Sequence, residues 1–509
     1  MAFFSHLPVF RMPKHPDSVM RRYFIVIQAA LLFATPSFAQ ELTHVEGLGS
    51  IYFPNSGSEE AQDDFIRGVL LLHSFEFGPS AQAFKSAQEK DPDFAMAYWG
   101  EAMTYNHPLW RAKDEQAASD VFARMPSTAP TDRENGYLNA VRILYAPGES
   151  KEDQDRAYME AMKRLSEAFP EDDEARAFYA ISILGSLNGE REFATYMKAA
   201  AAAAGVFKRN PNHPGGVHYL IHSFDDPVHA PLGLPAADAY SKIAPNAAHG
   251  QHMTSHIFVA MGLWDRVVSA NIIASAVQDA VRAEGGRGPN VCGHYSSWLH
   301  YGRLMQGEFE EAEALMDACH ERVASGNPSG GEWGYFVSMR ARHIMDSEMW
   351  SLANRWTANP PRWSIEQMAS RAGISGGRYF TYILTDAIAG LHQGDATTAH
   401  TVLDDDWGPS PGRVVQLNQL RGLLAIQEGD RDAGIALLAE AAAGEDAVPF
   451  EFGPPRLVKP TYESRGSALL AAGRNGEAEI AFRRAAERTP GRTLATKGLN
   501  AAAMNGTDD

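Results

Sequence analysis

The chain has 509 residues, enough for several domains or one long repeat array, and its apolar and charged fractions are ordinary for a globular protein. The net charge is −18, which argues against nucleic acid or another polyanion as a partner. Neither a phosphate-binding loop nor a dinucleotide fingerprint occurs, so no nucleotide cofactor is expected.

The sequence from Met20 to Ala39 has the pattern of a secretory signal peptide. Arg21 and Arg22 are followed by an apolar run and by Ser-Phe-Ala, so cleavage is expected after Ala39. The run is too short to span a membrane, and no other stretch reaches about 18 uninterrupted apolar residues, so no transmembrane segment is predicted. We therefore expect a periplasmic or secreted protein. Residues 1–19 indicate an over-extended gene start, with an unusually long leader as the alternative.

Residues 40–59 are expected to form an irregular lead-in, and amphipathic helices of roughly 12–18 residues follow to the end of the chain. Short breaks rich in Gly, Pro or Asn-Pro separate these helices, and convincing alternating strands are absent from the sequence. The pattern predicts an all-α array of helix hairpins, which we divide into 60–210, 211–323, 324–458 and 459–500.

The last hairpin carries small and aromatic residues at fixed places in a repeat counted from Lys459. The places are filled by Gly466, Ala478, Phe482 and Pro490. The segment that begins at Ala61 fits the same pattern and closes with Asp91-Pro92. Both segments resemble the tetratricopeptide repeat (TPR) family, whose unit is a helix hairpin of about 34 residues. The resemblance implies a right-handed α-solenoid, one continuous superhelix with ligands bound in its concave groove.

The segment from His218 to His256 holds six of the eighteen histidines of the chain. His218 and His222 form an H-x-x-x-H pair, and His252 and His256 form a second pair one repeat length later. In the register of the repeat, the two helices that carry these pairs start at Pro214 and Ala248. Both pairs then occupy equivalent positions, which the resemblance places on the concave groove.

Imidazoles on neighbouring helices can share a metal ion at about 2.0–2.1 Å from each ring nitrogen, because such helices pack about 8–10 Å apart. We predict a transition-metal site formed by His218, His222, His249, His252 and His256. An all-nitrogen ligand set suits zinc, copper, nickel or iron, and the sequence does not choose among them. Two other interpretations stay open: a ladder of hydrogen-bonded histidines, or a site for an organic or anionic ligand without metal.

Five further residues are expected to support this site. Asp225 and Asp226, on the loop after the first pair, are candidate acid–base groups if the site is catalytic. His229 on the same loop, together with His294 and Tyr301 in the next hairpin, is expected to orient the ligands or line the groove. An open coordination position would support a metal-dependent hydrolase or oxidase activity, although the sequence shows no established catalytic motif and identifies no substrate.

The two cysteines, Cys292 and Cys319, are placed near the start of one helix and near the end of the next. These ends of an antiparallel hairpin meet, so we expect a disulfide in an oxidising compartment. Two buried free thiols are the alternative.

The alternative function is a cell-envelope scaffold that binds a peptide or protein in the groove, without metal and without catalysis. Such a scaffold does not need five imidazoles in one register and would tolerate Asn or Gln in their place, whereas a metal site would not. The expected partner is therefore a peptide, a protein or a small ligand in the concave groove.

Overall fold

The computed structural model describes residues 42–187, 191–326, 328–357, 373–408, 410–449 and 452–505. The chain divides into two units, Met1–Leu42 and Thr43–Asp509, and the helices and strands of the described residues belong to the second. The predicted signal peptide and the residues before it lie outside the described residues. Among the described helices, none is long and apolar enough to cross a membrane.

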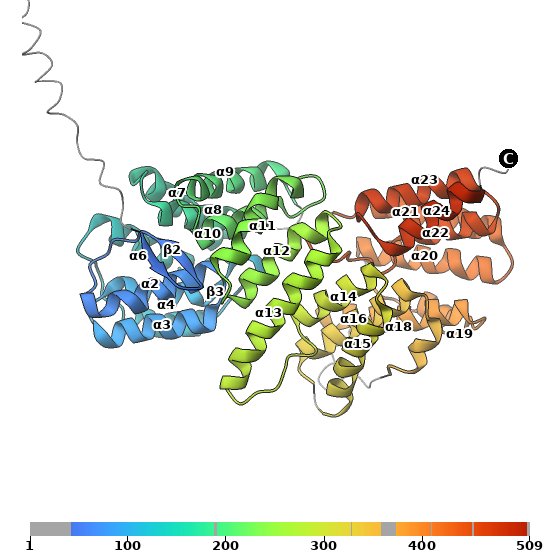
Figure 1. Ribbon diagram of the computed structural model, residues 1–509, viewed down its shortest axis with the longest axis horizontal. Coiled ribbons are helices and arrows are strands. Elements are labelled where there is room, and N and C mark those ends of the chain that lie inside the picture. Colours follow the sequence, from blue (N-terminus) through green and yellow to red (C-terminus); the bar gives the residue numbers. More distant parts are fainter. Residues whose placement is uncertain are drawn as a thin grey trace, which may run out of the picture. The chain divides into compact units, whose positions relative to one another are not determined.

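The described chain consists mainly of helices, and consecutive helices pack against each other as hairpins (Figure 1). This arrangement confirms the predicted all-α hairpin array. The region before the histidines contains α2 (Glu59–His73), α3 (Phe77–Lys90), α4 (Ala95–Thr104), the 3-10 helix η1 (Pro108–Trp110), α5 (Glu115–Phe122), α6 (Asp132–Leu144), α7 (Lys151–Ala168), α8 (Asp173–Gly185) and α9 (Phe193–Arg209).

The histidine-rich region contains three hairpins, drawn from green to yellow in Figure 1. Their helices are α10 (Pro214–Phe224), α11 (Ala230–Ile243), α12 (Ala248–Ala260), α13 (Trp264–Glu284), α14 (His294–Gln306) and α15 (Phe309–Ala324). Helices α10 and α12 begin at Pro214 and Ala248, the two starts that the repeat register predicts. Proline is favoured at the first position of a helix because its missing N–H has no partner there in any case.

The remaining helices follow the same hairpin pattern, and one of them, η2, is a short 3-10 helix. They are α16 (Gly330–Ser347), the 3-10 helix η2 (Trp350–Asn354), α18 (Gly373–His392), α19 (Thr397–Asp404), α20 (Pro411–Gln427), α21 (Arg431–Asp446), α22 (Thr461–Ala471), α23 (Asn475–Arg488) and α24 (Thr493–Asn505).

The expected irregular lead-in is in part a small antiparallel hairpin of strands β1 (Thr43–Val45) and β2 (Gly49–Ile51). Ser50 N–H donates to the carbonyl of Asn212, and the side chain of Asn210 donates to the carbonyl of Ser50. The hairpin is therefore stabilised by the turn between α9 and α10. A strand of three residues is too short to show an alternating pattern. Its contact with the turn between α9 and α10 joins residues far apart in the sequence, so no local pattern predicts it. A second short hairpin pairs β3 (Asn106–His107) with β4 (Ala112–Lys113).

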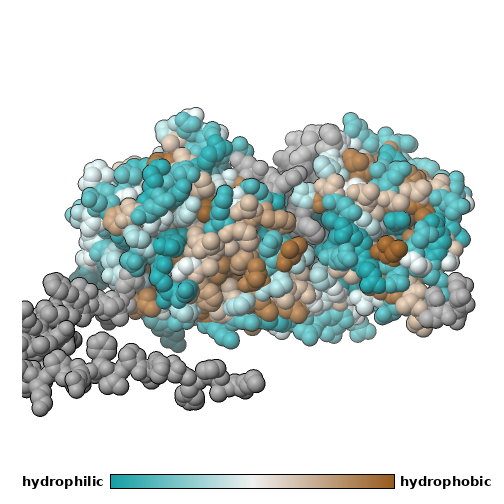
Figure 2. Space-filling model, turned by 90° about the horizontal axis from the view of Figure 1, so that it is seen from above, coloured by the Kyte–Doolittle hydropathy of each residue, from teal (hydrophilic) through white to brown (hydrophobic). Residues whose placement is uncertain are grey.

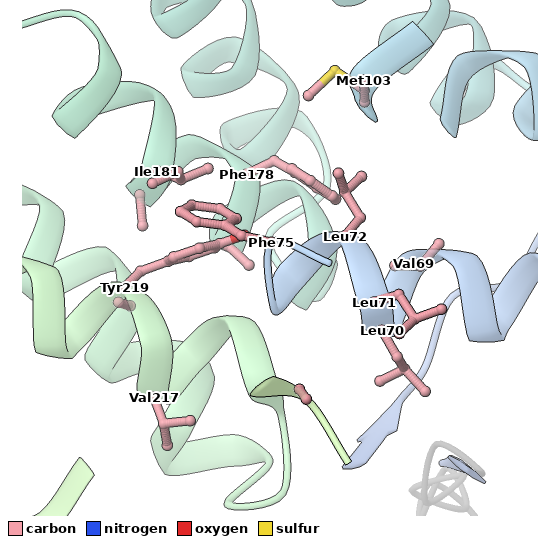
Figure 3. Close-up of a cluster of buried hydrophobic side chains, with 14 of the residues drawn as sticks. Val69, Leu70, Leu71, Leu72, Phe75, Met103, Phe178, Ile181, Val217 and Tyr219 are labelled. Carbon is pink, nitrogen blue, oxygen red and sulfur yellow. The ribbon is translucent and has the colours of Figure 1, made fainter. Parts of the chain in front are cut away.

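The main hydrophobic core runs from the first strands into the histidine-rich hairpins. Figure 3 shows part of it, with side chains from α2, α4, α8 and α10, and there Phe178 and Ile181 lie beside Phe75 and Tyr219. Phe178 and Tyr219 are almost completely buried, and such aromatic side chains contribute the largest apolar areas to a core. This packing holds α10 against α2 and so fixes the position of the helix that carries His218.

The C-terminal hairpin packs against α13 and α14, far away in the sequence. Trp264 Nε1–H donates to the carbonyl of Gly491 at 2.8 Å, and Thr493 Oγ1 donates to the carbonyl of Met305 at 2.6 Å. Arg492 is buried and pairs with Asp346 and Glu463 at 2.6 Å each. The array therefore contains a contact between distant hairpins in addition to those between neighbours.

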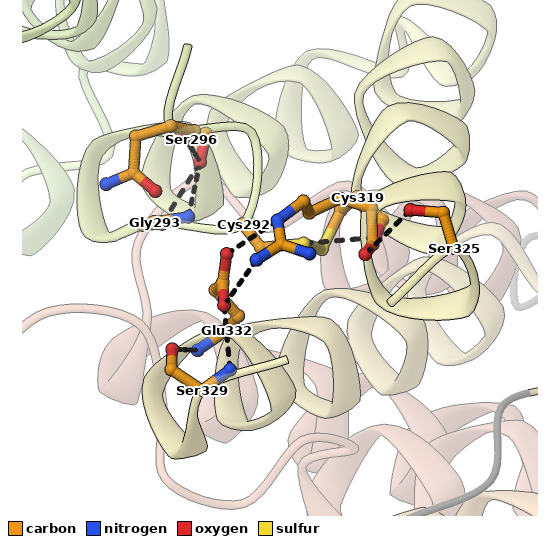
Figure 4. Close-up of a disulfide and its surroundings, with 9 residues drawn as sticks. Cys292, Gly293, Ser296, Cys319, Ser325, Ser329 and Glu332 are labelled. Atoms are coloured by element: carbon orange, nitrogen blue, oxygen red, sulfur yellow. Dashed lines mark hydrogen bonds and ion pairs between the residues drawn. A yellow bond between two sulfur atoms is a disulfide. The ribbon is translucent and has the colours of Figure 1, made fainter. Parts of the chain in front are cut away.

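Cys292 and Cys319, the predicted pair, form a disulfide with their Cα atoms 4.9 Å apart (Figure 4). The next residue, Gly293, caps α14, and its N–H donates to Ser296 Oγ at 2.9 Å. The disulfide therefore ties the start of α14 to α15, directly before His294.

The face in Figure 2 is largely hydrophilic toward its ends, and apolar residues gather near its middle. Large apolar side chains that stay exposed include Val228, Leu232, Ile272 and Ile273. The rest of this face is hydrophilic, and the protein as a whole carries a net charge of −18.

Candidate metal centre

Helix α10 places His218 close to the end of α2. A Cβ atom on Gly215 would lie 2.4 Å from His73 Nδ1, so this glycine lets the two helices approach. His218 Nδ1–H donates to the carbonyl of His73 at 2.6 Å. A carbonyl oxygen only accepts, so the proton of neutral His218 is on Nδ1 and the lone pair is on Nε2. That Nε2 lies 3.1 Å from His222 Nε2, one helical turn later.

Helix α12 carries His249, His252 and His256 and is buried along nearly its whole length. His252 Nδ1–H donates to Asn271 Oδ1 on α13 at 2.8 Å. The Asn271 amide is oriented by its own Nδ2–H, which donates to the carbonyl of Val267. His256 Nδ1–H donates to Asp225 Oδ2 at 2.5 Å.

Six histidines thus form two groups of three, and within each group one ligand atom per residue lies within 4.8 Å of the others. The groups are adjacent, since ring centroids of His249 and His252, and of His222 and His256, are 6.0 Å apart. We call them group A, with His218, His222 and His249, and group B, with His252, His256 and His294.

Group B contains two nitrogen lone pairs that face each other. His252 and His256 both commit their Nδ1–H to an acceptor, and their Nε2 atoms lie 3.2 Å apart. With both Nδ1–H groups committed, neither ring has a second N–H to place between these atoms when it is neutral, so the arrangement suits a shared cation, either a proton or a metal ion. Two imidazole nitrogens bound to one ion at about 2.0–2.1 Å lie about 2.9–3.4 Å apart when the angle between the bonds is about 90–110°. Both Nε2 separations, 3.1 and 3.2 Å, fall in this range.

Burial favours the neutral form of five of the six histidines. Desolvation lowers the pKa of His218 and of His294 to about 3, and it lowers the pKa of His222, His249 and His252 well below the usual value. Neighbouring imidazoles lower these pKa values further, because two protonated rings would repel each other. A neutral imidazole is the form that binds a metal ion, so the lowered pKa values of these five histidines favour their role as ligands at neutral pH.

The two predicted acid–base residues have different contacts. Asp225 is 2 % exposed and holds His256 through Oδ2. Asp226 accepts from the backbone N–H of Val228 and His229, binds His229 Nδ1 at 2.9 Å, and pairs with Arg191 at 3.0 Å. Asp225 therefore orients a candidate ligand, as carboxylates commonly do for metal-bound imidazoles, and Asp226 organises the loop.

His229 and Tyr301 do not reach the two groups. His229 Nδ1 is engaged by Asp226, and its ring lies 5.0 Å from that of Phe193. Tyr301 was expected in the groove beside His294, but it is buried and its hydroxyl is 3.3 Å from Arg492 Nη1. Tyr301 is two helical turns beyond His294, about 10 Å along α14, and this rise separates residues that share a helix face. That expectation was wrong.

His294 has a larger part than the sequence predicted. It joins group B, with its ring 4.4 Å from that of His252, and its Nδ1 is 3.3 Å from the hydroxyl of Tyr335. His249 Nε2 is buried without a hydrogen-bond partner. Each group thus receives two histidines from an H-x-x-x-H pair and a third from the following first helix of a hairpin.

A third cluster joins His73, Glu174 and His213, and its polar atoms are already satisfied. Each oxygen of Glu174 accepts from one histidine, at 2.6 Å from His73 and 2.9 Å from His213. His73 Nδ1 lies 2.9 Å from the Tyr219 hydroxyl, and His213 Nδ1 accepts from Gly216 N–H. Burial would raise the pKa of Glu174, but the two histidines lower it to about 2. This network stabilises the base of group A.

An open cavity of about 550 Å³ reaches both groups, since His249 and His294 line it. Its other walls combine aromatic residues with small and polar ones, and the aromatic residues are Phe75, Phe77, His107, Trp110, Tyr295 and Tyr335. Phe75 and Arg111, next to Trp110, have φ angles of 55° and 53°. Such left-handed conformations are strained for residues other than glycine and are concentrated at functional sites. The cavity gives a small molecule access to His249 and His294.

Several supporting residues escaped the sequence analysis because they come from distant helices. They are the His73 carbonyl, Asn271, and Trp298, whose ring lies 4.6 Å from that of His252 and 4.5 Å from that of His256. The helical spacing of Trp298 contains no signal of its contact with the histidines.

No family model matches the chain, and no curated protein matches its sequence. Among solved structures it is similar to the TPR domain of P58(IPK), at 12% identity and a TM-score of 0.20, with 88% of this chain and 98% of that chain covered. It is also similar to Naa15/Naa10 bound to HypK-THB, at 12% identity and a TM-score of 0.23, covering 83% and 62%. Likenesses this low carry no argument. Fold and site by themselves define an all-α hairpin protein with a buried double group of histidines.

Proposed function

We propose that this chain is an exported helical-hairpin protein that binds transition-metal ions in groups A and B, one ion in each. The observation that carries the proposal is the pair of opposed Nε2 lone pairs of His252 and His256, 3.2 Å apart, with both Nδ1–H groups committed elsewhere. A metal ion is a better occupant than a proton, because it can be bound by the imidazoles of His252, His256 and His294 together, whereas a proton is shared by two nitrogens only.

The donor chemistry supports the same assignment. Three imidazoles for one ion leave coordination positions open, an arrangement in which a bound ion activates water or another small molecule. The aromatic cavity at His249 and His294 offers room for such a molecule. The all-nitrogen set favours zinc, copper, nickel or iron over magnesium or calcium. A metal-dependent hydrolase or oxidase acting on a small molecule is the enzyme class that this arrangement supports.

Export is part of the proposal. It rests on the signal pattern that ends at Ala39 and on the Cys292–Cys319 disulfide, a bond typical of oxidising compartments.

The test is metal content by mass spectrometry on purified protein, before and after incubation with zinc, copper, nickel or iron. We expect about two ions per chain, about one in His218→Asn/His222→Asn and about one in His252→Asn/His256→Asn. His400→Asn is the matched control, because His400 is exposed and paired with Glu428, and it is expected to keep both ions. Folding of each variant is checked by circular dichroism. A folded wild-type chain that acquires none of these metals would overturn the proposal and favour the peptide-binding scaffold.

A further inference from the structure

A separate cavity of about 540 Å³ is lined by four arginines, although the protein as a whole is acidic. Its walls are α16, α18 and α20, together with the segment that precedes α22. The arginines are Arg342 on α16, Arg378 on α18, Arg413 on α20 and Arg456 on the segment before α22. No histidine of group A or group B lines this cavity.

The helix register turns polar and small residues toward the cavity. On α16, Gly334, Ser338 and Arg342 follow one another at four-residue spacing, which places them on one helix face. Thr381 on α18 and Gln416 on α20 add a hydroxyl and an amide. A Cβ atom on Gly334 would lie 2.6 Å from Arg378 Cζ, so this glycine makes room for the guanidinium of Arg378.

Arg342, Arg378 and Arg413 are each held by a backbone carbonyl oxygen. Arg342 Nη2–H donates to the carbonyl of Pro455 at 3.0 Å, Arg378 Nη1–H donates to the carbonyl of Gly330 at 2.5 Å, and Arg413 Nη1–H donates to the carbonyl of Trp407. These bonds orient the guanidinium groups without neutralising them. Among the described residues, no aspartate or glutamate lines the cavity. Burial lowers the pKa of Arg342 and of Arg378, as expected for cations drawn out of water.

Guanidinium groups gathered in this way match oxyanions. The planar fork of arginine binds a carboxylate or phosphate through two parallel N–H···O bonds, and Arg342, Arg378 and Arg413 each have donors beyond the one bound to a carbonyl. Ser338, Thr381 and Gln416 add neutral hydrogen-bonding groups, while Val337, Phe380 and Leu457 form an apolar wall. The volume exceeds that of a bare inorganic anion and lies in the range of small-molecule pockets.

We propose that this cavity binds a small organic anion, with its carboxylate or phosphate held by Arg342, Arg378 and Arg413 and its apolar part against Phe380 and Leu457. The site is independent of the metal centre, since it shares none of the six histidines.

The test is isothermal titration of the full mature chain with phenyl phosphate, benzoate and inorganic phosphate, and with benzyl alcohol as the neutral probe. We expect phenyl phosphate or benzoate to bind, inorganic phosphate to bind about tenfold more weakly or less, and benzyl alcohol not to bind. Binding of phenyl phosphate would identify a phosphate as the recognised group, and binding of benzoate would identify a carboxylate. Arg378→Gln and Arg413→Gln are each expected to weaken binding by about tenfold or more, because a charged hydrogen bond is lost. Gly334→Ala is expected to weaken it as well, since the added methyl group displaces Arg378 while its charge remains.

The matched control is Arg474→Gln, which removes an exposed arginine that pairs with Glu477, and it is expected to bind like the wild type. Binding is also expected to persist in His252→Asn/His256→Asn, so failure of the metal proposal leaves this result unchanged. The proposal is overturned if none of the anions binds at millimolar concentration to folded protein, or if binding is the same in Arg378→Gln and Arg413→Gln as in the wild type.

Discussion

Asp225 Oδ2 accepts a hydrogen bond from His256 Nδ1–H at 2.5 Å, and this contact determines which nitrogen of His256 faces His252. The carboxylate belongs to the residue that ends α10, and the imidazole belongs to α12. One contact therefore links the two helices that carry the H-x-x-x-H pairs and fixes the ring of a candidate ligand. Groups that orient metal-bound imidazoles in this way typically change metal affinity by about 10–100-fold when they are replaced.

We predict that Asp225→Asn weakens metal binding by about 10–100-fold, because a neutral amide still accepts the hydrogen bond but no longer makes the imidazole more basic. Competition with a chromophoric chelator measures the affinity. Asp226→Asn is the neighbouring control. It removes the charge opposite Arg191 and is expected to lower stability while leaving the affinity of the folded protein unchanged. Equal affinities for Asp225→Asn and the wild type would exclude the orienting role.

The starts of α10 and α12, at Pro214 and Ala248, could be predicted because the repeat register is a local signal that can be counted along the sequence. The partition of the histidines could not, because it depends on which residues of successive hairpins meet. His294 was expected to orient ligands and instead joins His252, at a ring distance of 4.4 Å. Tyr301 shares its helix face but lies two turns away beside Arg492. Sequence spacing defines a face of a helix, whereas the partner of that face is set by tertiary packing.

We predict that Gly215→Ala lowers the free energy of unfolding by about 1–3 kcal/mol, the usual cost of an overpacked contact. The added Cβ would lie 2.4 Å from His73 Nδ1, so α10 must move away from α2 and the bond from His218 to the His73 carbonyl is strained. The affinity of group A for a metal ion is expected to decrease in the same variant, because His218 belongs to that group. Urea denaturation and chelator competition give the two quantities.

The matched control for this variant is Gly78→Ala in α3, where an added Cβ meets nothing within 4 Å. Alanine is a better helix former than glycine, so this change is expected to be neutral or stabilising by up to about 1 kcal/mol. Similar losses of stability in both variants would show that the contact between α10 and α2 is not the cause.

We predict that the metal-free protein loses stability as the pH falls below about 6.5. His218 and His294 have folded-state pKa values of about 3, depressed below the unfolded value near 6.5. Between these values the unfolded chain binds more protons than the folded chain, so unfolding becomes more favourable, by up to about 1.4 kcal/mol per pH unit for each such histidine. Above the unfolded value the two states bind equally few protons, and the effect disappears.

Chemical denaturation of chelator-treated protein at several pH values between about 4 and 7.5 measures this dependence. His294→Asn is expected to reduce the slope, since one of the depressed groups is gone. A stability that is constant across this window would contradict the buried neutral state of these histidines.

We predict that removal of the disulfide by Cys292→Ser/Cys319→Ser lowers the free energy of unfolding by about 3 kcal/mol, the loop-entropy effect for the 27-residue separation. Because the bond anchors the start of α14, group B is expected to release its ion faster than group A. Stopped-flow mixing with a chelator resolves the two rates. Unchanged release from group B in a folded variant would show that His294 is held by other contacts.

The final prediction concerns the contact that joins the C-terminal hairpin to α14 and α16. Arg492 lies between Asp346 and Glu463, and all three are almost fully buried. We expect Arg492→Met to lower the free energy of unfolding by about 3–5 kcal/mol, since two buried carboxylates lose their shared partner. Arg484→Met, which removes an exposed arginine paired with Glu487, is expected to change stability by less than about 1 kcal/mol.

This variant also tests whether the C-terminal hairpin covers the metal centre. The segment before α22 passes over Trp298 at Gly453, where a Cβ would lie 2.5 Å from the indole, and the Phe452 ring is 6.0 Å from that of His256. Trp298 in turn packs on His252 and His256. If Arg492 holds this segment in place, Arg492→Met releases metal to a chelator several-fold faster under conditions where it remains folded, whereas Arg484→Met does not. Equal release rates would mean that the segment covers the histidines independently of the buried arginine, through its own contact with Trp298.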